Sequence, residues 1–150
     1  MFSFKKLVIG PIVLAVLLAG CSNAATSNAP GGNGSPAAGG STVMVKSLGG
    51  ANGLVAGSNN MTLYTFDSDV ANNGKSACTG GCATTWPPLT VPSGTTPTAG
   101  AGASGALKTI TRDDGSMQVT YNGMPLHFYS GDTAPGDTNG HYPGWNIAKP

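Results

Sequence analysis

The sequence predicts an all-β domain of two tandem three-strand antiparallel meanders, packed together as one small sandwich or barrel-like domain. The first observation behind this prediction is an internal repeat, because MTLYTFDSD at residues 61–69 returns as MPLHFYSGD at residues 124–132. The second is the composition: the 150 residues include 24 glycines and no glutamate, and abundant Gly, Ser, Thr, Asn and Pro favour turns and strands over helices. The third is an Asn-Gly pair directly before the second copy, which is typical of a hairpin.

The second copy displays its strands and turns most clearly. Asn122-Gly123 joins two runs of alternating residues, and both residues of the pair accept positive φ. In the run before this turn, Met117, Val119 and Tyr121 share one face of the predicted strand. The predicted order of strand, turn, strand, turn and strand is 107–112, 113–115, 116–121, 122–123 and 124–129.

The first copy follows the same template less regularly. Its predicted strands, joined by turns rich in Gly and Asn, cover 42–48, 54–58 and 61–66. Trp86 and Trp145 fall at similar distances downstream of the two copies, and we expect them to close the ends of the core. Because a single meander would leave its apolar face in water, the two copies are expected to shield each other.

A low-complexity segment, PSGTTPTAGAGASGA at residues 92–106, is predicted to be a flexible linker between the copies. It divides a duplicated β domain (43–150) into repeat 1 (43–91) and repeat 2 (107–150). Residues 100–105 spell GxGxxG, but a dinucleotide site needs a strand before this motif and a helix after it. Proline and glycine surround the motif and a strand is predicted next, so a nucleotide site is not expected.

The N-terminal residues predict a lipoprotein signal sequence. Two lysines precede an apolar run that is too short to span a bilayer, which fits a signal peptide over residues 1–20. The stretch LAGC at residues 18–21 resembles the bacterial lipobox, in which the cysteine is acylated, with palmitate among the expected chains, and becomes the new N-terminus. An ordinary secreted protein, cleaved near Ala24-Ala25, is the alternative.

Residues 21–41 form a predicted disordered tether that starts at the lipidated Cys21, because residues 22–41 carry no charge and no large apolar side chain. Acyl chains would hold the protein on a membrane, since each buried methylene contributes about 0.8 kcal/mol. We therefore expect a lipid-anchored protein of the cell envelope. Ser22, in place of an aspartate, indicates the outer membrane if the organism has two membranes.

Charge argues against one class of partner. From Cys21 onward the chain has five cations and six aspartates, a net charge of −1. A near-neutral chain gains little from releasing counterions of a polyanion. We therefore expect no nucleic-acid partner, and we expect the membrane to be a partner through the lipid anchor.

Cys78 and Cys82 are the cysteines that remain beside Cys21, and they predict a disulfide, the default outside the cytoplasm. A copper or other soft-metal site is the alternative, because thiolates suit Cu(I) and imidazole suits copper. His127 and His141 are the two histidines of the chain. A metal-handling or redox accessory protein would use both cysteines and one histidine.

Two aspartate-rich turns, at residues 67–69 and 131–140, offer oxygen atoms to Ca²⁺. The second lacks the bidentate glutamate of a full calcium loop, and Asp or Asn before Gly more often makes turns. No catalytic residue is predicted, because the sequence shows no nucleophile elbow and no separated pair of carboxylates. We expect a protein that is not an enzyme and has no cofactor, with copper and calcium as the metal alternatives.

The sequence resembles a known bacterial family in three stretches: YTFDSD (64–69), CTGGCATTWPPL (78–89) and PGDTNG (135–140). That family is the predicted lipoproteins with a Yx(FWY)xxD motif, also described as a secreted repeat of unknown function. The motif positions are Tyr64, Phe66 and Asp69 in the first copy and His127, Tyr129 and Asp132 in the second. The second copy thus has histidine where the family has tyrosine. The resemblance covers most of residues 43–150 and implies an envelope lipoprotein without an established activity.

The motif aromatics leave two interpretations open. They either fill the domain core or form a platform for a glycan or an envelope protein, because aromatic rings supply a large contact area with a polar handle. The sequence therefore predicts a membrane-anchored bacterial envelope lipoprotein of unknown activity, with a binding or structural role. The metal-handling protein is the alternative function.

Overall fold

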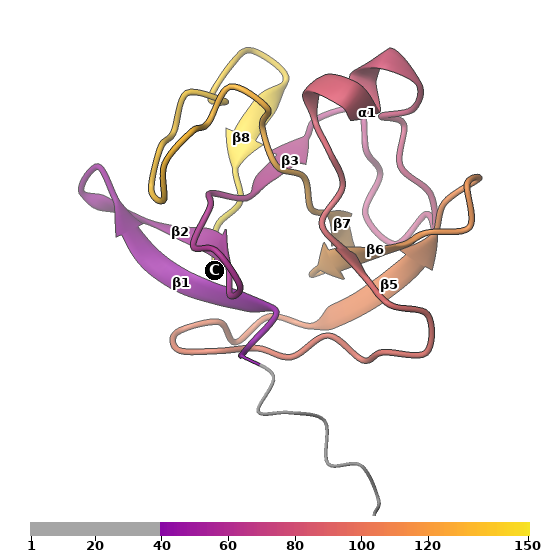
Figure 1. Cartoon of the computed structure of the whole chain (residues 1–150), viewed down its shortest axis with the longest axis horizontal. Coiled ribbons are helices and arrows are strands. Elements are labelled where there is room, and N and C mark those ends of the chain that lie inside the picture. Colours follow the sequence, from indigo (N-terminus) through magenta and orange to yellow (C-terminus); the bar gives the residue numbers. More distant parts are fainter. Residues whose placement is uncertain (1–39) are drawn as a thin grey trace, which may run out of the picture. The chain divides into compact units, whose positions relative to one another are not determined.

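The structure is a computed structural model that describes residues 40–150. The predicted signal peptide, Cys21 and the tether up to residue 39 lie outside the described residues. The regular elements of the described part are strands and one short helix (Figure 1). In chain order they are β1 Val43–Leu48, β2 Ala51–Ala56, β3 Tyr64–Phe66, α1 Gly81–Thr85, β4 Thr90–Val91, β5 Leu107–Thr111, β6 Met117–Tyr121, β7 Met124–Pro125 and β8 Trp145–Ile147. Within residues 40–150, no helix has the length and apolar character needed to cross a membrane.

The second copy forms the predicted meander. β5 pairs antiparallel with β6 in a register that joins Thr109 to Val119, and β6 pairs antiparallel with β7. The turn between β6 and β7 has Asn122 at φ 49° and Gly123 at φ 85°, the left-handed region that these two residue types accept. The third strand is shorter than predicted, because from His127 onward its backbone bonds to the first copy.

The first copy departs further from its predicted meander. Gly49 (φ 58°) and Gly50 (φ 95°) make a two-residue turn between β1 and β2, so β2 begins earlier than predicted. The expected third strand contacts β2 through one antiparallel bridge, between Val55 and Thr62. The following residues form β3, which pairs antiparallel with β8 from the far end of the chain.

The last strand of each copy pairs with a strand of the other copy. β4, from the first copy, pairs with β6 of the second, and β8, from the second copy, pairs with β3 of the first. Equivalent backbone hydrogen bonds hold both exchanged segments: Val119 N–H to Leu89 O (2.8 Å), Leu89 N–H to Leu126 O (3.0 Å), Leu54 N–H to Ala148 O (2.8 Å) and Ala148 N–H to Leu63 O (2.8 Å). The two copies are therefore interlocked and not simply stacked.

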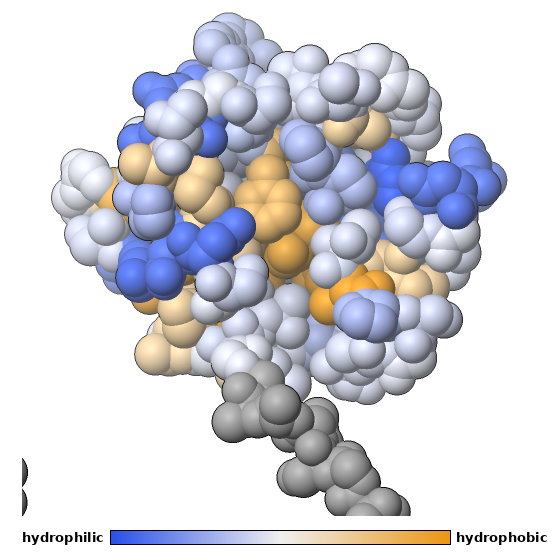
Figure 2. All heavy atoms as spheres, in the orientation of Figure 1, coloured by the Kyte–Doolittle hydropathy of each residue, from blue (hydrophilic) through white to orange (hydrophobic). Residues whose placement is uncertain are grey.

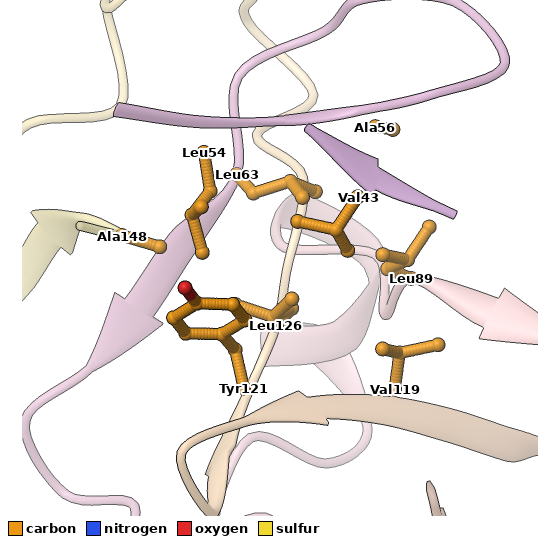
Figure 3. Packing of buried hydrophobic residues seen from close by; sticks show 9 residues of the cluster. All are labelled: Val43, Leu54, Ala56, Leu63, Leu89, Val119, Tyr121, Leu126 and Ala148. Carbon is orange, nitrogen blue, oxygen red and sulfur yellow. The ribbon is translucent and has the colours of Figure 1, made fainter. Parts of the chain in front are cut away.

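The main core receives side chains from both copies (Figure 3). Its buried members are Val43, Leu54, Ala56, Leu63, Leu89, Val119, Tyr121, Leu126 and Ala148. Burying one leucine side chain stabilises a fold by about 1.5–3 kcal/mol. The all-β prediction is confirmed, and the residues of this cluster show that the two copies shield each other's apolar side chains.

Residues 92–106 differ from the flexible linker that their composition predicted. Part of the segment runs along the open edge of β1. Backbone hydrogen bonds that hold it there include Thr42 N–H to Thr98 O (2.8 Å), Gly100 N–H to Val43 O (2.7 Å) and Val45 N–H to Ala101 O (2.9 Å). A Cβ atom on Gly102 would lie 2.9 Å from Val45 Cβ, so glycine permits the close approach. The small residues that suggested mobility serve close packing at this edge.

Large apolar side chains are scarce on the surface. Among the described residues, Val70 is 62% exposed and Tyr142 is 48% exposed, while the other large apolar side chains are at least partly covered. On the face drawn in Figure 2, apolar residues (orange) show mainly in a hollow near the centre, between hydrophilic groups (blue) on two sides. This face therefore offers no broad apolar patch to a partner.

Candidate functional site

The motif positions of the two copies bond to each other across the boundary between the copies. Tyr64 and His127 exchange two backbone hydrogen bonds, with N···O distances of 2.8 and 3.0 Å. Each side chain then reaches the aspartate of the opposite copy. The Tyr64 hydroxyl donates to Asp132 Oδ2 (2.7 Å), and His127 Nε2 lies 3.0 Å from Asp69 Oδ2. All four residues are buried, so each copy of the motif is completed by the other.

The pair of Tyr64 and Asp132 is held by the backbone around it. The Tyr64 hydroxyl accepts a hydrogen bond from Gly140 N–H (3.2 Å), and Asp132 Oδ1 accepts one from Asn139 N–H (3.0 Å). Burial, followed by the hydrogen bond to Asp132, raises the pKa of Tyr64 well above its usual range. The phenol therefore keeps its proton and serves as a donor inside the domain.

The pair of His127 and Asp69 is enclosed in the same way. His127 Nδ1 lies 3.3 Å from the Trp86 carbonyl oxygen, so both ring nitrogens face oxygen acceptors. Asp69 also accepts hydrogen bonds from Ser76 Oγ–H (3.2 Å) and Ala77 N–H (2.6 Å). Both side chains of the pair have no exposed surface. Histidine in the second copy thus contacts the opposite aspartate as tyrosine does in the first copy.

A further polar network extends from His127 to Gln118 and Arg112, which the sequence did not indicate as site residues. Gln118 Nε2 donates to Leu126 O (2.9 Å) and lies 3.3 Å from His127 Nε2. Arg112 donates to Gln118 Oε1 (2.6 Å) and to the Cys78 carbonyl oxygen (2.7 Å). Gln118 and Thr120 alternate with the apolar residues of β6, but this strand is buried on both faces, which makes its polar residues internal. A polar residue within a strand that lies at the centre of a sheet is the sequence feature that could have indicated the buried position of Gln118.

The two tryptophans stack on each other at the centre of a column of four rings. Trp86 and Trp145 have ring centroids 3.8 Å apart and planes within 2° of parallel. Phe66 stacks on the outer side of Trp145 (4.4 Å), and Tyr129 lies against the outer side of Trp86 (4.5 Å). The prediction that the tryptophans close the ends of the core is wrong, because the exchange of β4 and β8 brings them together in a second buried cluster.

The structure distributes the motif aromatics between core and edge. Tyr64 and His127 are fully buried, whereas Phe66 and Tyr129 are half-buried at the two ends of the column. The Tyr129 hydroxyl lies 3.0 Å from the hydroxyl of the exposed Tyr142. The motif rings therefore belong mainly to the core. On the surface, an aromatic contact for a partner is limited to Tyr129 and Tyr142 at one end of the four-ring column.

Cys78 and Cys82 form the predicted disulfide, which closes the loop that leads into α1. With both sulfurs bonded to each other, this structure holds no thiolate pair for copper. The candidate histidines are differently placed: His127 is buried against Asp69, and His141 is exposed. Across residues 40–150, no three or more His, Cys, Asp or Glu side chains converge as a metal site. The metal alternative thus gains no support from the arrangement of its proposed ligands.

The second aspartate-rich turn uses its carboxylates within the protein. Asp137 Oδ2 accepts hydrogen bonds from the backbone N–H groups of Thr133 and Ala134, both at 2.9 Å. These bonds hold the pKa of Asp137 below its usual value. Asp132 accepts a hydrogen bond from the buried Tyr64 hydroxyl, as described above. Carboxylates that bond their own turn fit the turn-making interpretation.

We predict that replacing both cysteines of the disulfide (Cys78→Ser with Cys82→Ser) lowers the free energy of unfolding by about 2 kcal/mol, because a closed five-residue loop no longer restricts the unfolded chain. Urea denaturation with and without a reductant measures this change. Reductant is expected to destabilise the wild type by a similar amount and to leave the double variant unchanged. Equal stability of all samples would contradict the prediction.

The comparison with known families fits this arrangement. The family described as a secreted repeat of unknown function matches the chain twice, over residues 50–90 and 108–149, together more than half of its length. The chain belongs to this secreted-repeat family. The first match contains Tyr64 and Asp69 and the second contains His127 and Asp132, so each match includes one half of both reciprocal contacts. Membership agrees with an extracellular or envelope location. Comparison with curated proteins and with solved structures gave no match.

Proposed function

We propose that this secreted-repeat protein is a lipid-anchored envelope lipoprotein whose duplicated domain is a rigid binding or structural module and not an enzyme. The observation that supports it most is the mutual burial of the motif. Tyr64, Asp69, His127 and Asp132 satisfy one another inside the domain and do not line an open site.

The environment of His127 also argues against acyl-transfer chemistry. A serine nucleophile needs its hydroxyl on the imidazole, with the carboxylate on the opposite ring nitrogen. Here Ser76 Oγ donates to Asp69, and the imidazole has no exposed surface that a substrate can reach. The arrangement is that of a buried structural network, in which satisfied polar groups specify a single packing.

The membrane anchor rests on the N-terminal sequence. A cysteine that follows a short apolar run and small residues is the expected acylation site, and more than one acyl chain gives stable anchoring. The tether between Cys21 and the domain would hold the module away from the lipid surface. Partners in the envelope, a protein or a glycan, are then within reach of an anchored module.

Replacing the lipobox cysteine (Cys21→Ser) is expected to move the protein from the membrane fraction to the soluble fraction. Cells fed an alkyne analogue of palmitate should label the wild type and the variant without the disulfide, which keeps Cys21, but not Cys21→Ser. Where two membranes exist, their separation on a density gradient tests the outer-membrane assignment. Mass spectra of the mature wild-type protein would rule the anchor out if they showed an unmodified Cys21, or if they showed cleavage near Ala24.

A further inference from the structure

A cavity of about 310 Å³ opens between the disulfide loop and the turn that joins β5 to β6. Lys75, Thr79 and Ala83 line it from one side, and Arg112, Asp113 and Asp114 line it from the other. In Figure 2, hydrophilic residues (blue) gather at the edge where Figure 1 shows the β5–β6 turn. The reciprocal motif pairs do not line this cavity, so it is a separate feature of the domain.

Arg112 gives the cavity a fixed positive group. Its two hydrogen bonds, to Gln118 Oε1 and to the Cys78 carbonyl, go to neutral acceptors. Among residues 40–150, no carboxylate oxygen lies within 4 Å of the guanidinium nitrogens of Arg112, and the charge of Arg112 contributes at longer range to the lowered pKa of Asp114. A guanidinium has five N–H donors, and three of these remain after the two contacts. A half-buried, oriented and unpaired guanidinium suits a carboxylate ligand.

The opposite sign is present on the same wall. Asp114 Oδ1 accepts hydrogen bonds from the Ser116 hydroxyl (2.6 Å) and backbone N–H (2.9 Å), and these bonds, the hydroxyl's first, lower the pKa of Asp114. Asp113 is exposed, and no hydrogen bond to its carboxylate occurs within the described domain. With Lys75 and Arg112, the lining carries two positive and two negative groups. A ligand with one charge only would meet repulsion as well as attraction.

We propose that this cavity binds a small zwitterion, a free amino acid or dipeptide, with the ligand carboxylate on Arg112 and the ligand ammonium on Asp113 and Asp114. The volume lies at the lower end of about 300–1,000 Å³ for small-molecule sites, which suits a ligand of this size. The inference rests on the binding role proposed above and not on the membrane anchor. The disulfide contributes to the site, because it holds the loop whose Cys78 carbonyl positions Arg112.

The test is a titration of the purified full chain with L-alanyl-L-alanine, followed by calorimetry and by amide chemical shifts around the cavity. Two matched probes each lack one charge: N-acetyl-alanyl-alanine lacks the ammonium, and alanyl-alanine amide lacks the carboxylate. The zwitterion is expected to bind at least about 10-fold more tightly than either, since a hydrogen bond to a charged group contributes about 1.5–3 kcal/mol.

Variants separate binding from folding. Asp113→Asn is expected to weaken binding of the zwitterion about 10-fold without changing stability, because Asp113 is exposed. Arg112→Lys is expected to abolish binding, and its stability is measured in parallel since Arg112 also bonds to Gln118. Lys108→Gln, on the exposed side of β5 and outside the cavity lining, is the control and should bind like the wild type.

Equal affinity for all three probes, no saturable binding of the dipeptide, or unchanged binding by Asp113→Asn would overturn the zwitterion site. Such a result would leave the anchored module untouched, since anchoring is decided by acylation of Cys21. Conversely, a soluble, unacylated protein that binds the dipeptide would remove the anchor and keep the site.

Discussion

Replacing Trp86 by alanine is expected to lower the free energy of unfolding by about 3–5 kcal/mol, the usual cost of deleting a buried tryptophan side chain. Trp86 is 7% exposed, and its ring contacts Trp145 on one face and Tyr129 on the other. Its loss interrupts the four-ring column in the middle. It also removes packing between the two copies, since each copy contributes one of the central rings.

Chemical denaturation of the variant against the wild type measures the effect of Trp86→Ala. Val70→Ala is the control, because Val70 is 62% exposed and its truncation should change stability by no more than about 0.5 kcal/mol. Trp86→Phe, which keeps an aromatic ring in the column, is expected to lie between the two. If Trp86→Ala were no more destabilising than Val70→Ala, the column would not be a stabilising element.

Replacing Asp69 by alanine is expected to cost about 3–5 kcal/mol, because removing one partner of a buried polar pair leaves the other without compensation. The carboxylate of Asp69 faces His127 Nε2 and accepts hydrogen bonds from Ser76 and Ala77. All three donors would lose their acceptor. The loop that leads to the disulfide would lose its attachment at the same time.

Asp67→Ala provides a matched control for Asp69→Ala two residues away. Asp67 is exposed and accepts one side-chain hydrogen bond from Asn146 (2.7 Å), so its loss should cost about 1 kcal/mol or less. Both variants are compared with the wild type by thermal and urea unfolding. Similar losses for the two aspartates would mean that the motif aspartate has no special role in holding the copies together.

The sequence predicted what local chemistry determines. Asn122-Gly123 gave the correct turn because few residues other than Asn and Gly accept its positive φ values. The repeat of nine residues correctly indicated two related strand units. The start of β2 was misplaced, because two glycines, Gly49 and Gly50, complete the turn where a longer one was expected.

What escaped prediction depends on contacts between distant parts of the chain. Alternation along a strand does not specify which strand lies beside it, so the pairing of β3 with β8 was not anticipated. The stack of Trp86 on Trp145 follows from that exchange and was missed for the same reason. The internal position of Gln118 was not predicted, because an alternating pattern does not show that β6 is covered on both faces.

The candidate site was only partly visible in the sequence. The motif residues were identified by resemblance, and the two interpretations, core or platform, remained open until their burial was known. Their reciprocal bonding crosses from one copy to the other, so no spacing within either copy reveals it. Arg112 lies next to two aspartates in a predicted turn, where sequence alone suggests a solvated charge. Its selection as a candidate depends on the loop of Cys78 folding against it.

The exchange of closing strands means that neither copy is self-sufficient. Half of this chain, expressed alone, would have one unpaired strand in solvent and one strand position without its partner. Two identical halves would fill each other's empty positions by forming a symmetric dimer. Fusing such halves into one gene makes their association independent of concentration. It also lets the two inner surfaces differ, as they do where one copy carries tyrosine and the other carries histidine.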